Sequence, residues 1–473
     1  MRRGQFPLSA LPAWCLLNDI TFDGVSVEHT ETRGLGLVAV KDLANEENGT
    51  EIPALLTIPK DLVLSAVGVE EYAKESKHFR QLLDTTGHQS IRGNILLFLL
   101  AQLVLSSPDY TDKQGVTTPW TQYFNLLPAQ VPVPTLWSKS ELILLRGTSL
   151  EAAVSAKLSA LAREFDRVRE TTADLPLWNE LLNNDEVITL RDWILLDALY
   201  RSRSLGLPKS GESMVPCLDL VNHSSPATAY FEENSRDEVV LLLRHGLKVP
   251  KQGEITIDYG HDKSAAEMLF TYGFIDPSST AKSIVLPLES LNDDPLAKAK
   301  LRAFGAPPTL KIVDNADTGI PRWEAPFVYL MCLNEEDGLN FKILQETDGS
   351  QHLRMFWQDI DVTSEAENLE ELVKRHELSQ VFHLRTVTVV LEMIQRRLEA
   401  LNTPKEDMMS EYVRPEVLQV ASHLRAVEQK LLDRILKVLE DERAQLFEDE
   451  SVLAYLGSME DIQQDNIDNE DFS

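Results

Sequence analysis

Three short stretches near the middle of the chain carry the residues that decide the fold. They read Val215-Pro216-Cys217-Leu218-Asp219-Leu220-Val221-Asn222-His223-Ser224, then Ile255-Thr256-Ile257-Asp258-Tyr259-Gly260, and then Glu267-Met268-Leu269-Phe270-Thr271-Tyr272-Gly273-Phe274. The β-branched residues before the Asp-Tyr-Gly turn predict a strand that ends at that turn. Each stretch alone is unspecific, because a single histidine in a turn usually has only a structural role. The order and spacing of all three together are specific.

Two β-rich blocks flank a long helical segment in the sequence. Strands are predicted at Val25–Val27, Gly36–Val40, Leu55–Ile58, Val239–Leu243 and Ile255–Ile257. Apolar residues at helical spacing predict helices in Ile91–Leu105, Ser149–Arg169 and Thr189–Tyr200, and again between residues 381 and 438. Neither block has enough strands to bury a face by itself, so the blocks at 22–65 and 213–276 are expected to meet in one β-rich unit.

This alternation indicates an α+β protein in which a helical insertion splits a β-rich domain and an all-α domain follows. The predicted boundaries are 1–65 for the first part of the β-rich domain, 66–200 for the insertion, 201–280 for the second part, 281–455 for the all-α domain and 456–473 for a tail. The tail is acidic and lacks basic residues, a composition typical of disordered segments.

Composition excludes several classes of protein. No run approaches the ~20 apolar residues that span a bilayer, and Pro7, Pro12 and Asp19 interrupt the stretch that a secretory signal would need. A cytoplasmic protein, or one that also enters the nucleus, is therefore expected. The three cysteines show no CxxC spacing, so no metal is expected. A formal charge of −30 disfavours nucleic acid and suits a basic partner, although solubility alone explains it equally well.

Gly34-Leu35-Gly36 is the second region of interest. A dinucleotide-binding fingerprint would need a helix after these glycines and a third glycine, whereas the strand-like Val38-Ala39-Val40 follows here. A Rossmann-type methyltransferase is therefore disfavoured. The glycines predict instead a loop whose backbone closely approaches a ligand.

The Asn-His-Ser segment, the Asp-Tyr-Gly turn and the Tyr-Gly-Phe element resemble those of SET-domain protein lysine methyltransferases. The resemblance is to the branch of the Rubisco large-subunit enzymes and the fungal ribosomal and elongation-factor lysine methyltransferases. It implies S-adenosylmethionine as the cofactor, a C-terminal domain that binds the protein substrate, and a monomer. It also implies a non-histone substrate such as a ribosomal protein or elongation factor, with neither nucleic acid nor membrane as a direct partner.

The resemblance further assigns roles to residues. Tyr259 is implied to be catalytic, beside the transferring methyl group. The residues implied to bind the cofactor are Gly34, Leu35, Gly36, Arg203, Asn222, His223, Tyr259 and Phe274. The residues implied to bind the substrate are Ser202, Leu205, Asp219, Tyr230, Ile257 and Tyr272. The family often has glutamate where this chain has Arg33, so the resemblance gives Arg33 no role.

Methyl transfer from a sulfonium to an amine is an in-line displacement, so the protein mainly aligns and desolvates the reactants. The target lysine must arrive neutral against an ordinary pKa of ~10.4, which calls for an apolar, aromatic channel. Two alternatives stay open: a SET-like binding module without catalysis, and methylation of a histidine. The apolar Leu205 favours lysine over histidine, because the family places a polar residue near this position for histidine. A phosphotransferase is disfavoured because the chain lacks a GxxxxGK[ST] loop.

Overall fold

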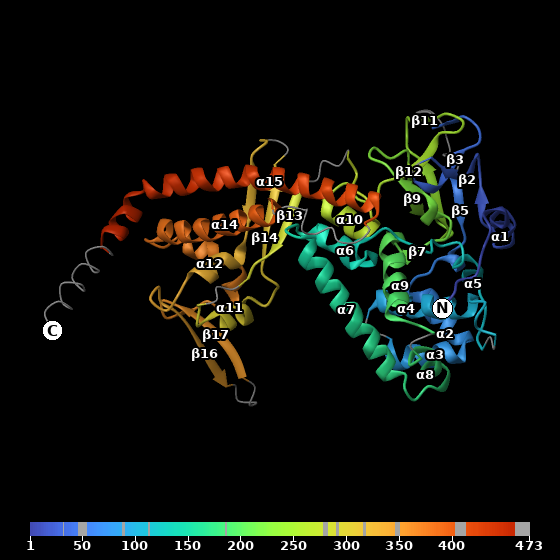
Figure 1. Cartoon of the computed structure of the whole chain (residues 1–473), viewed down its shortest axis with the longest axis horizontal. Coiled ribbons are helices and arrows are strands. Elements are labelled where there is room, and N and C mark those ends of the chain that lie inside the picture. Colours follow the sequence, from blue (N-terminus) through green and yellow to red (C-terminus); the bar gives the residue numbers. More distant parts are fainter. Residues whose placement is uncertain are drawn as a thin grey trace. The chain divides into compact units, whose positions relative to one another are not determined.

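The computed structural model describes residues 1–31, 33–45, 54–87, 90–111, 114–184, 187–277, 282–289, 293–315, 318–345, 351–402 and 413–458. The chain forms two compact units. The first contains Met1–Ser138, Ala153–Lys263 and Glu267–Ser279, and the second contains Lys139–Ala152, Ser264–Ala266 and Thr280–Ser473. Each is described by itself below, with the elements labelled as in Figure 1.

One four-stranded sheet of the first unit joins the two β-rich blocks of the sequence. Its order is β2 (Val25–Thr30), β3 (Gly34–Ala39), β12 (Glu254–Ile257) and β8 (Asn222–His223). The β12–β8 pair is parallel, with Thr256 opposite Asn222 and Ile257 opposite His223. The predicted meeting of the blocks is thus confirmed, because strands from both lie in this sheet.

A second four-stranded sheet mixes the blocks again. Its order is β1 (Thr21–Phe22), β5 (Ala54–Ile58), β10 (Val239–Leu243) and β9 (Ala229–Glu233). All five residues of β10 are buried, which explains its uninterrupted apolar sequence. Two small pairs complete the strands of this unit: β4 (Leu43–Ala44) with β11 (Lys248–Val249), and β6 (Ser204–Leu207) with β7 (Gly211–Met214).

Helices fill the segment between the two β-rich blocks. The helices that begin before residue 273 are α1 (Leu11–Leu17), α2 (Ala66–Glu75), α3 (Lys77–Thr86), α4 (Ile91–Ser106), α5 (Pro119–Tyr123), α6 (Lys139–Leu142), α7 (Leu150–Thr171), α8 (Pro176–Leu182), α9 (Leu190–Arg203) and α10 (Ala265–Tyr272). The three helices predicted from apolar spacing are confirmed as α4, α7 and α9. Local signals start two of them, since the hydroxyls of Ser90 and Thr189 accept the N-terminal backbone hydrogen bonds of α4 and α9.

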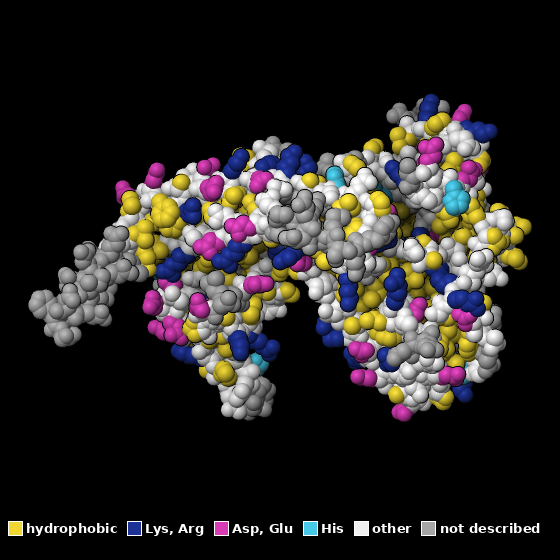
Figure 2. All heavy atoms as spheres, viewed as in Figure 1, with side chains coloured by type: hydrophobic (Ala, Val, Ile, Leu, Met, Phe, Trp, Pro, Cys, Tyr) yellow, Lys and Arg dark blue, Asp and Glu magenta, His cyan; other side chains and the backbone are white. Residues whose placement is uncertain are grey.

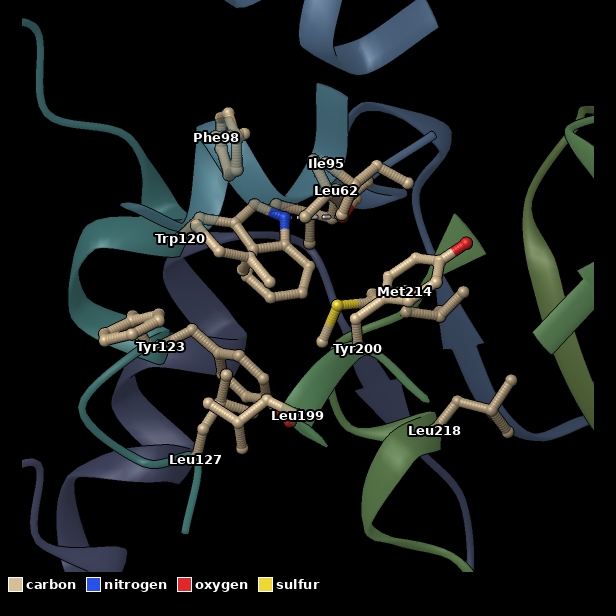
Figure 3. Close-up of a cluster of buried hydrophobic side chains, with 14 of the residues drawn as sticks. Leu62, Ile95, Phe98, Trp120, Tyr123, Leu127, Leu199, Tyr200, Met214 and Leu218 are labelled. Atoms are coloured by element: carbon tan, nitrogen blue, oxygen red, sulfur yellow. Dashed lines mark hydrogen bonds between the residues drawn. The ribbon is translucent and has the colours of Figure 1, made fainter. Parts of the chain in front are cut away.

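Aromatic side chains from the helices pack on the strands in the core shown in Figure 3. The ring of Trp120 meets Phe98 and Tyr123 edge-on, with centroids 6.5 and 5.5 Å away. Its indole N–H donates to the carbonyl of Leu62 at 2.9 Å, so the polar edge is satisfied although the ring is buried. The hydroxyl of Tyr123 also forms a hydrogen bond with the functional site.

The second unit contains strands as well as helices. Two antiparallel three-stranded sheets are formed, one by β13 (Ser283–Pro287), β14 (Thr309–Asp314) and β15 (Pro321–Glu324), the other by β16 (Leu339–Gln345), β17 (Gln351–Trp357) and β18 (Ile360–Asp361). Its helices after residue 280 are α11 (Ala297–Phe304), α12 (Pro326–Cys332), α13 (Leu369–Val373), α14 (Ser379–Asn402) and α15 (Pro415–Phe447). The α+β class and the long C-terminal helices are confirmed, but the C-terminal region is not all-α.

The missed strands left a readable signal in the sequence. In β13 only Ile284 and Leu286 are buried while their neighbours are half-buried or exposed, an alternation with period two. The helical spacing in α14 and α15 covers more residues and is more regular than this alternation. The prediction of an all-α region rested on these two helices and was wrong for the shorter segments that form strands. Residues 450–458 are helical, and the rest of the predicted acidic tail lies outside the described residues. No helix in the described ranges is long and apolar enough to cross a bilayer.

Three helices of the first unit are joined by one buried carboxylate. Asp197 of α9 is fully buried and pairs with Arg92 of α4, Lys157 of α7 and Arg201 of α9, at 2.6, 2.9 and 2.8 Å. Burial raises the pKa of Asp197, but the three cations outweigh burial and the pKa is lowered. Its stabilising contribution is therefore complete above the unfolded pKa of about 4 and is lost as the pH falls through the lower folded value.

We expect Asp197→Ala to lower the free energy of unfolding by about 3–5 kcal/mol at neutral pH, because it leaves cations without their buried partner. Urea unfolding followed by circular dichroism measures the change. Asp166→Ala on α7 is the control: Asp166 is exposed, so its loss should change stability by less than about 0.5 kcal/mol. Equal effects for the two variants would contradict a structural role for the buried carboxylate.

Candidate active site

Two cavities of the first unit share one wall. The large cavity has a volume of about 680 Å³ and the narrow cavity about 230 Å³. The residues that line both are Ser202, Arg203, Asp219, Tyr259 and Tyr272. All five were predicted as site residues: Ser202, Asp219 and Tyr272 for the substrate, Arg203 for the cofactor, and Tyr259 both for the cofactor and as the catalytic residue. The shared wall is therefore where two bound molecules would meet.

Tyr259 is fixed at each of its polar atoms. Its hydroxyl donates to the carbonyl of Val221 at 2.7 Å, and its backbone N–H donates to Nδ1 of His223 at 3.1 Å. Its carbonyl accepts from the hydroxyl of Tyr272 at 3.1 Å and from Nζ of Lys263 at 2.5 Å. Burial raises the pKa of Tyr259 well above its ordinary value, so the phenol stays protonated. It can serve as a neutral dipole but not as a base near neutral pH.

His223 stands between the Tyr259 backbone and an acid. Because Nδ1 accepts the Tyr259 N–H, the neutral ring carries its proton on Nε2, which lies 3.1 Å from Oδ2 of Asp276. The carbonyl of His223 accepts from Nη1 of Arg33 at 2.7 Å, and Arg33 also lies 3.6 Å from Glu254. Both Arg33 and Asp276 line the large cavity, although neither was predicted as a site residue.

Asn222 ties the strands together at Gly34-Leu35-Gly36, which form the start of strand β3 and not the predicted loop. Its Nδ2 donates to the carbonyl of Leu35 at 3.1 Å and to Oε1 of Glu254 at 2.8 Å. Gly34 and Leu35 line the large cavity together with Asn222. Gly36 is not among the lining residues and lies behind them, where a Cβ would stand 2.7 Å from Nδ2 of Asn222. Its smallness therefore makes room for the asparagine rather than for a ligand.

The half-buried Arg203 and the buried carboxylate of Asp219 form an ion pair at the shared wall. Nη1 of Arg203 donates to the carbonyl of Asp219 at 2.7 Å and to its carboxylate at 3.1 Å. The hydroxyl of Tyr123 donates to the same carboxylate and accepts from the N–H of Cys217. Burial raises the pKa of Asp219, with the arginine acting in the opposite direction. Asp219 lines both cavities, but these contacts describe a buried turn acid that holds Arg203.

Apolar and aromatic residues make up half of the lining of the narrow cavity. Its lining includes three predicted substrate residues, Leu205, Ile257 and Tyr272, and several others: Leu218, Val221, Phe231, Asp258 and Lys263. Burial raises the pKa of Tyr272 to about 12, so this phenol too is neutral. Ser202, at the shared wall, donates to the carbonyl of Ala198 at 2.7 Å. Phe274 lies on the side of the large cavity, its ring centroid 5.9 Å from His223.

The structure does not bring Tyr230 to either cavity, contrary to the prediction. Tyr230 lies on β9, and the guanidinium of Arg244 stands 6.0 Å from its ring centroid. The next residue, Phe231, lines the narrow cavity instead. Successive side chains of a strand point to opposite faces, so an error of one position along β9 moves the side chain to the wrong side.

Among the described residues, no group of three or more His, Cys, Asp or Glu side chains could hold a metal ion. The cavities are instead lined by hydrogen-bond donors, aromatic rings and apolar groups. One of these donors lacks a partner within the described part of the chain: Nε of Arg203 is buried without a hydrogen bond. An anionic ligand group in the large cavity would suit this guanidinium.

Solved structures share this architecture over nearly the whole chain. The SET domain of LSMT bound to methyllysine and AdoHcy matches with a TM-score of 0.66 and 22% identity, covering 94% of both chains. Rubisco LSMT bound to AdoMet matches with a TM-score of 0.65 and 21% identity, over 94% of both chains. The chain has a SET-domain fold. The expectation drawn from the three central stretches is thereby confirmed for the fold.

Sequence relatives agree with the fold. SET domain-containing protein 8 of Schizosaccharomyces pombe is 28% identical over 439 residues, which cover 90% of this chain and 96% of that protein. The chloroplastic Rubisco large subunit N-methyltransferase of Pisum sativum is 27% identical, over 57% of this chain and 51% of that protein. Actin-histidine N-methyltransferase of Gallus gallus is 22% identical, over 71% and 54%. The matches thus span about half the length of the pea and chicken proteins. No protein-family model matches the chain.

We expect Gly36→Ala to lower the free energy of unfolding by about 1–3 kcal/mol, because the added methyl group overpacks a site bounded by Asn222, Thr30 and Glu254. Thermal and urea unfolding measure the loss. Gly206→Ala is the matched control, since Gly206 also lies on a strand and a Cβ there meets nothing within 4 Å. A Gly36→Ala protein as stable as the Gly206→Ala protein would show that the close approach does not constrain the site.

Proposed function

We propose that this SET-domain protein transfers a methyl group from S-adenosylmethionine to the side-chain amine of a lysine in another protein. The observation that carries the proposal is the pair of unequal cavities that meet at Tyr259 and Tyr272. The relatives support it, because those from Pisum sativum and Arabidopsis thaliana are named as protein lysine methyltransferases or Rubisco large-subunit N-methyltransferases. The structures that share the fold were solved with AdoMet or AdoHcy.

The large cavity fits the cofactor. Its volume of about 680 Å³ lies within the ordinary range of small-molecule sites. Arg203 offers a half-buried guanidinium whose Nε is buried and unpaired among the described residues, which suits the cofactor's carboxylate. Gly34, Leu35 and Phe274 line the same cavity. When bound, the cofactor supplies a methyl group on a positively charged sulfur.

The narrow cavity fits a lysine side chain. Leu205, Phe231 and Ile257 line it with apolar groups that desolvate an ammonium and so favour its neutral form. The phenol of Tyr259 is held by Val221 and stays protonated, so it orients the amine by its dipole and removes no proton. Alignment and electrostatics, rather than a covalent step on the protein, account for the chemistry.

The identity of the acceptor protein is a finer proposal. A ribosomal protein or elongation factor is the class that the family resemblance suggests, and the formal charge of −30 favours such basic partners over long distances. Histidine is the second candidate acceptor, because three actin-histidine methyltransferases are among the relatives. The apolar Leu205 in the narrow cavity favours lysine.

The deciding experiment incubates the purified protein with labelled S-adenosylmethionine and a methyl-poor cell extract. Amino-acid analysis of the labelled band should yield methyllysine. Methylhistidine there would establish the second candidate instead. A protein that binds S-adenosylhomocysteine but labels nothing would be a SET-like binding module.

We expect Tyr259→Phe to slow single-turnover methyl transfer by roughly 10–1000-fold while the affinity for S-adenosylhomocysteine stays nearly constant, since one preorganised hydroxyl dipole is lost and the ring is kept. Asn222→Ala should behave in the opposite way and weaken that affinity, because its amide holds Leu35 at the large cavity. Calorimetric binding and single-turnover rates for both variants separate the two effects. A Tyr259→Phe protein as fast as the parent would remove the catalytic assignment.

We also propose that the second unit recruits the protein substrate. Its acidic side chains are spread over the face shown in Figure 2, among basic ones. Three exposed glutamates lie close in sequence around α13, at Glu365, Glu367 and Glu377. Changing all three to glutamine should raise the KM for a basic acceptor protein several-fold at low salt and by less at high salt, because the attraction is screened.

The control removes three exposed acids from the first unit: Asp166→Asn, Glu170→Gln and Asp174→Asn. It changes the net charge equally, so a general charge effect would raise the KM alike in both proteins. A recruiting surface would raise it only in the first. The kcat should stay unchanged in either protein, because none of these side chains lines the two cavities.

A further inference from the structure

The narrow cavity contains an ammonium group of the chain itself. Lys263 lies four residues after Tyr259 in the sequence and lines this cavity. Its Nζ donates to the carbonyl of Tyr259 at 2.5 Å and lies 5.8 Å from the ring centroid of Tyr272. A fixed cation thus stands beside the two aromatic residues where a target lysine would place its own amine.

Four charged side chains line the narrow cavity: Arg203, Asp219, Asp258 and Lys263. Arg203 and Asp219 pair with each other at 3.1 Å. Asp258 is only partly buried, accepts from the N–H of Gly260 at 2.7 Å, and lies 3.9 Å from His223 and 3.7 Å from His261. The two tyrosines at the wall are neutral. Without Lys263 the lining would therefore carry a net negative charge and would favour a protonated lysine.

A protonated lysine cannot attack, because its nitrogen has no lone pair. A nearby carboxylate stabilises the protonated form, whereas a nearby cation destabilises it. Apolar walls and the positively charged sulfur of the bound cofactor act in the same direction as a cation. Lys263 adds a cation of the chain itself that lines the same cavity as Asp258 and is placed to offset it.

We propose that the ammonium of Lys263 sets the charge state of the acceptor, offsetting Asp258 so that the narrow cavity holds the target lysine as its neutral, reactive amine. The proposal rests on the proposed methylation of lysine. It assigns Lys263 an electrostatic role on the incoming amine in addition to its hydrogen bond to Tyr259. That hydrogen bond alone would predict a loss of rate that is the same at every pH.

The test compares rate against pH for Lys263→Met, which keeps an unbranched side chain one atom shorter and without charge, and for Lys263→Arg, which keeps the charge. The acceptor is the total protein of the methyl-poor extract. The rate at which the labelled methyl group is incorporated into the acceptor band is measured from pH 6.5 to 10. In Lys263→Met the midpoint at which the rate rises with pH should move up by about one unit, so that the rate falls about tenfold at pH 7.5 and recovers at high pH. Lys263→Arg should keep the parent's profile within about twofold.

Two further variants make the outcome decisive. Asp258→Asn should move the midpoint down, and the double variant with Lys263→Met should return it toward the parent's value. Lys248→Met removes an exposed lysine from β11 and should leave the profile unchanged. Thermal unfolding and S-adenosylhomocysteine affinity verify that each protein is folded, and Lys263→Gln takes the place of Lys263→Met if the latter is not.

A Lys263→Met rate that is lowered equally at all pH values, or left unchanged, overturns the charge-setting role while the proposed function stands. A midpoint that moves down overturns it too. Absence of methyllysine with the unaltered protein overturns the proposed function, and the proposal for Lys263 with it.

Discussion

The parallel pairing of β8 with β12 is the constraint on which the rest of the site depends. It sets Asn222 opposite Thr256 and His223 opposite Ile257. Because the chain continues from Ile257 directly into Asp258 and Tyr259, this register delivers the Tyr259 N–H to Nδ1 of His223. A slip of one residue would turn every side chain of the pair to the other face. The position of Tyr259 in the shared wall therefore depends on strand register before it depends on side-chain chemistry.

Much of the fold could be predicted from local patterns. The β-branched run before Asp258, the five apolar residues of β10 and the helical spacing in α4 and α9 each identify their element, since burial imposes a period on the sequence. The strands of the second unit were not predicted, because prediction from periodicity favours long patterns. They are short, and the alternation of Ile284 and Leu286 is weaker evidence than the long stripes of α14 and α15.

The site was predicted less completely than the fold. Residues within the three central stretches were found because their order is specific, whereas Asp276, Arg33 and Phe231 depend on tertiary geometry. Phe231 differs from the predicted Tyr230 by one step of strand alternation. Asp276 follows Phe274 closely, but only folding shows that it faces Nε2 of His223. Sequence spacing cannot predict such contacts, because they join segments that are not related by the regular repeat of a helix or a strand.

The shared wall also bears on how one architecture can serve different acceptors. Tyr259, Tyr272 and Arg203 line both cavities, so a change in any of them alters the two cavities together. Residues that line only the narrow cavity, such as Leu205 and Phe231, can change without disturbing the large one. Relatives of this chain include proteins named for lysine and for histidine methylation, and such a separation is compatible with both. Under the proposed function, the choice between an amine and an imidazole depends on the polarity and charge of that narrow lining, where the apolar side chain of Leu205 offers an imidazole N–H no hydrogen-bond partner.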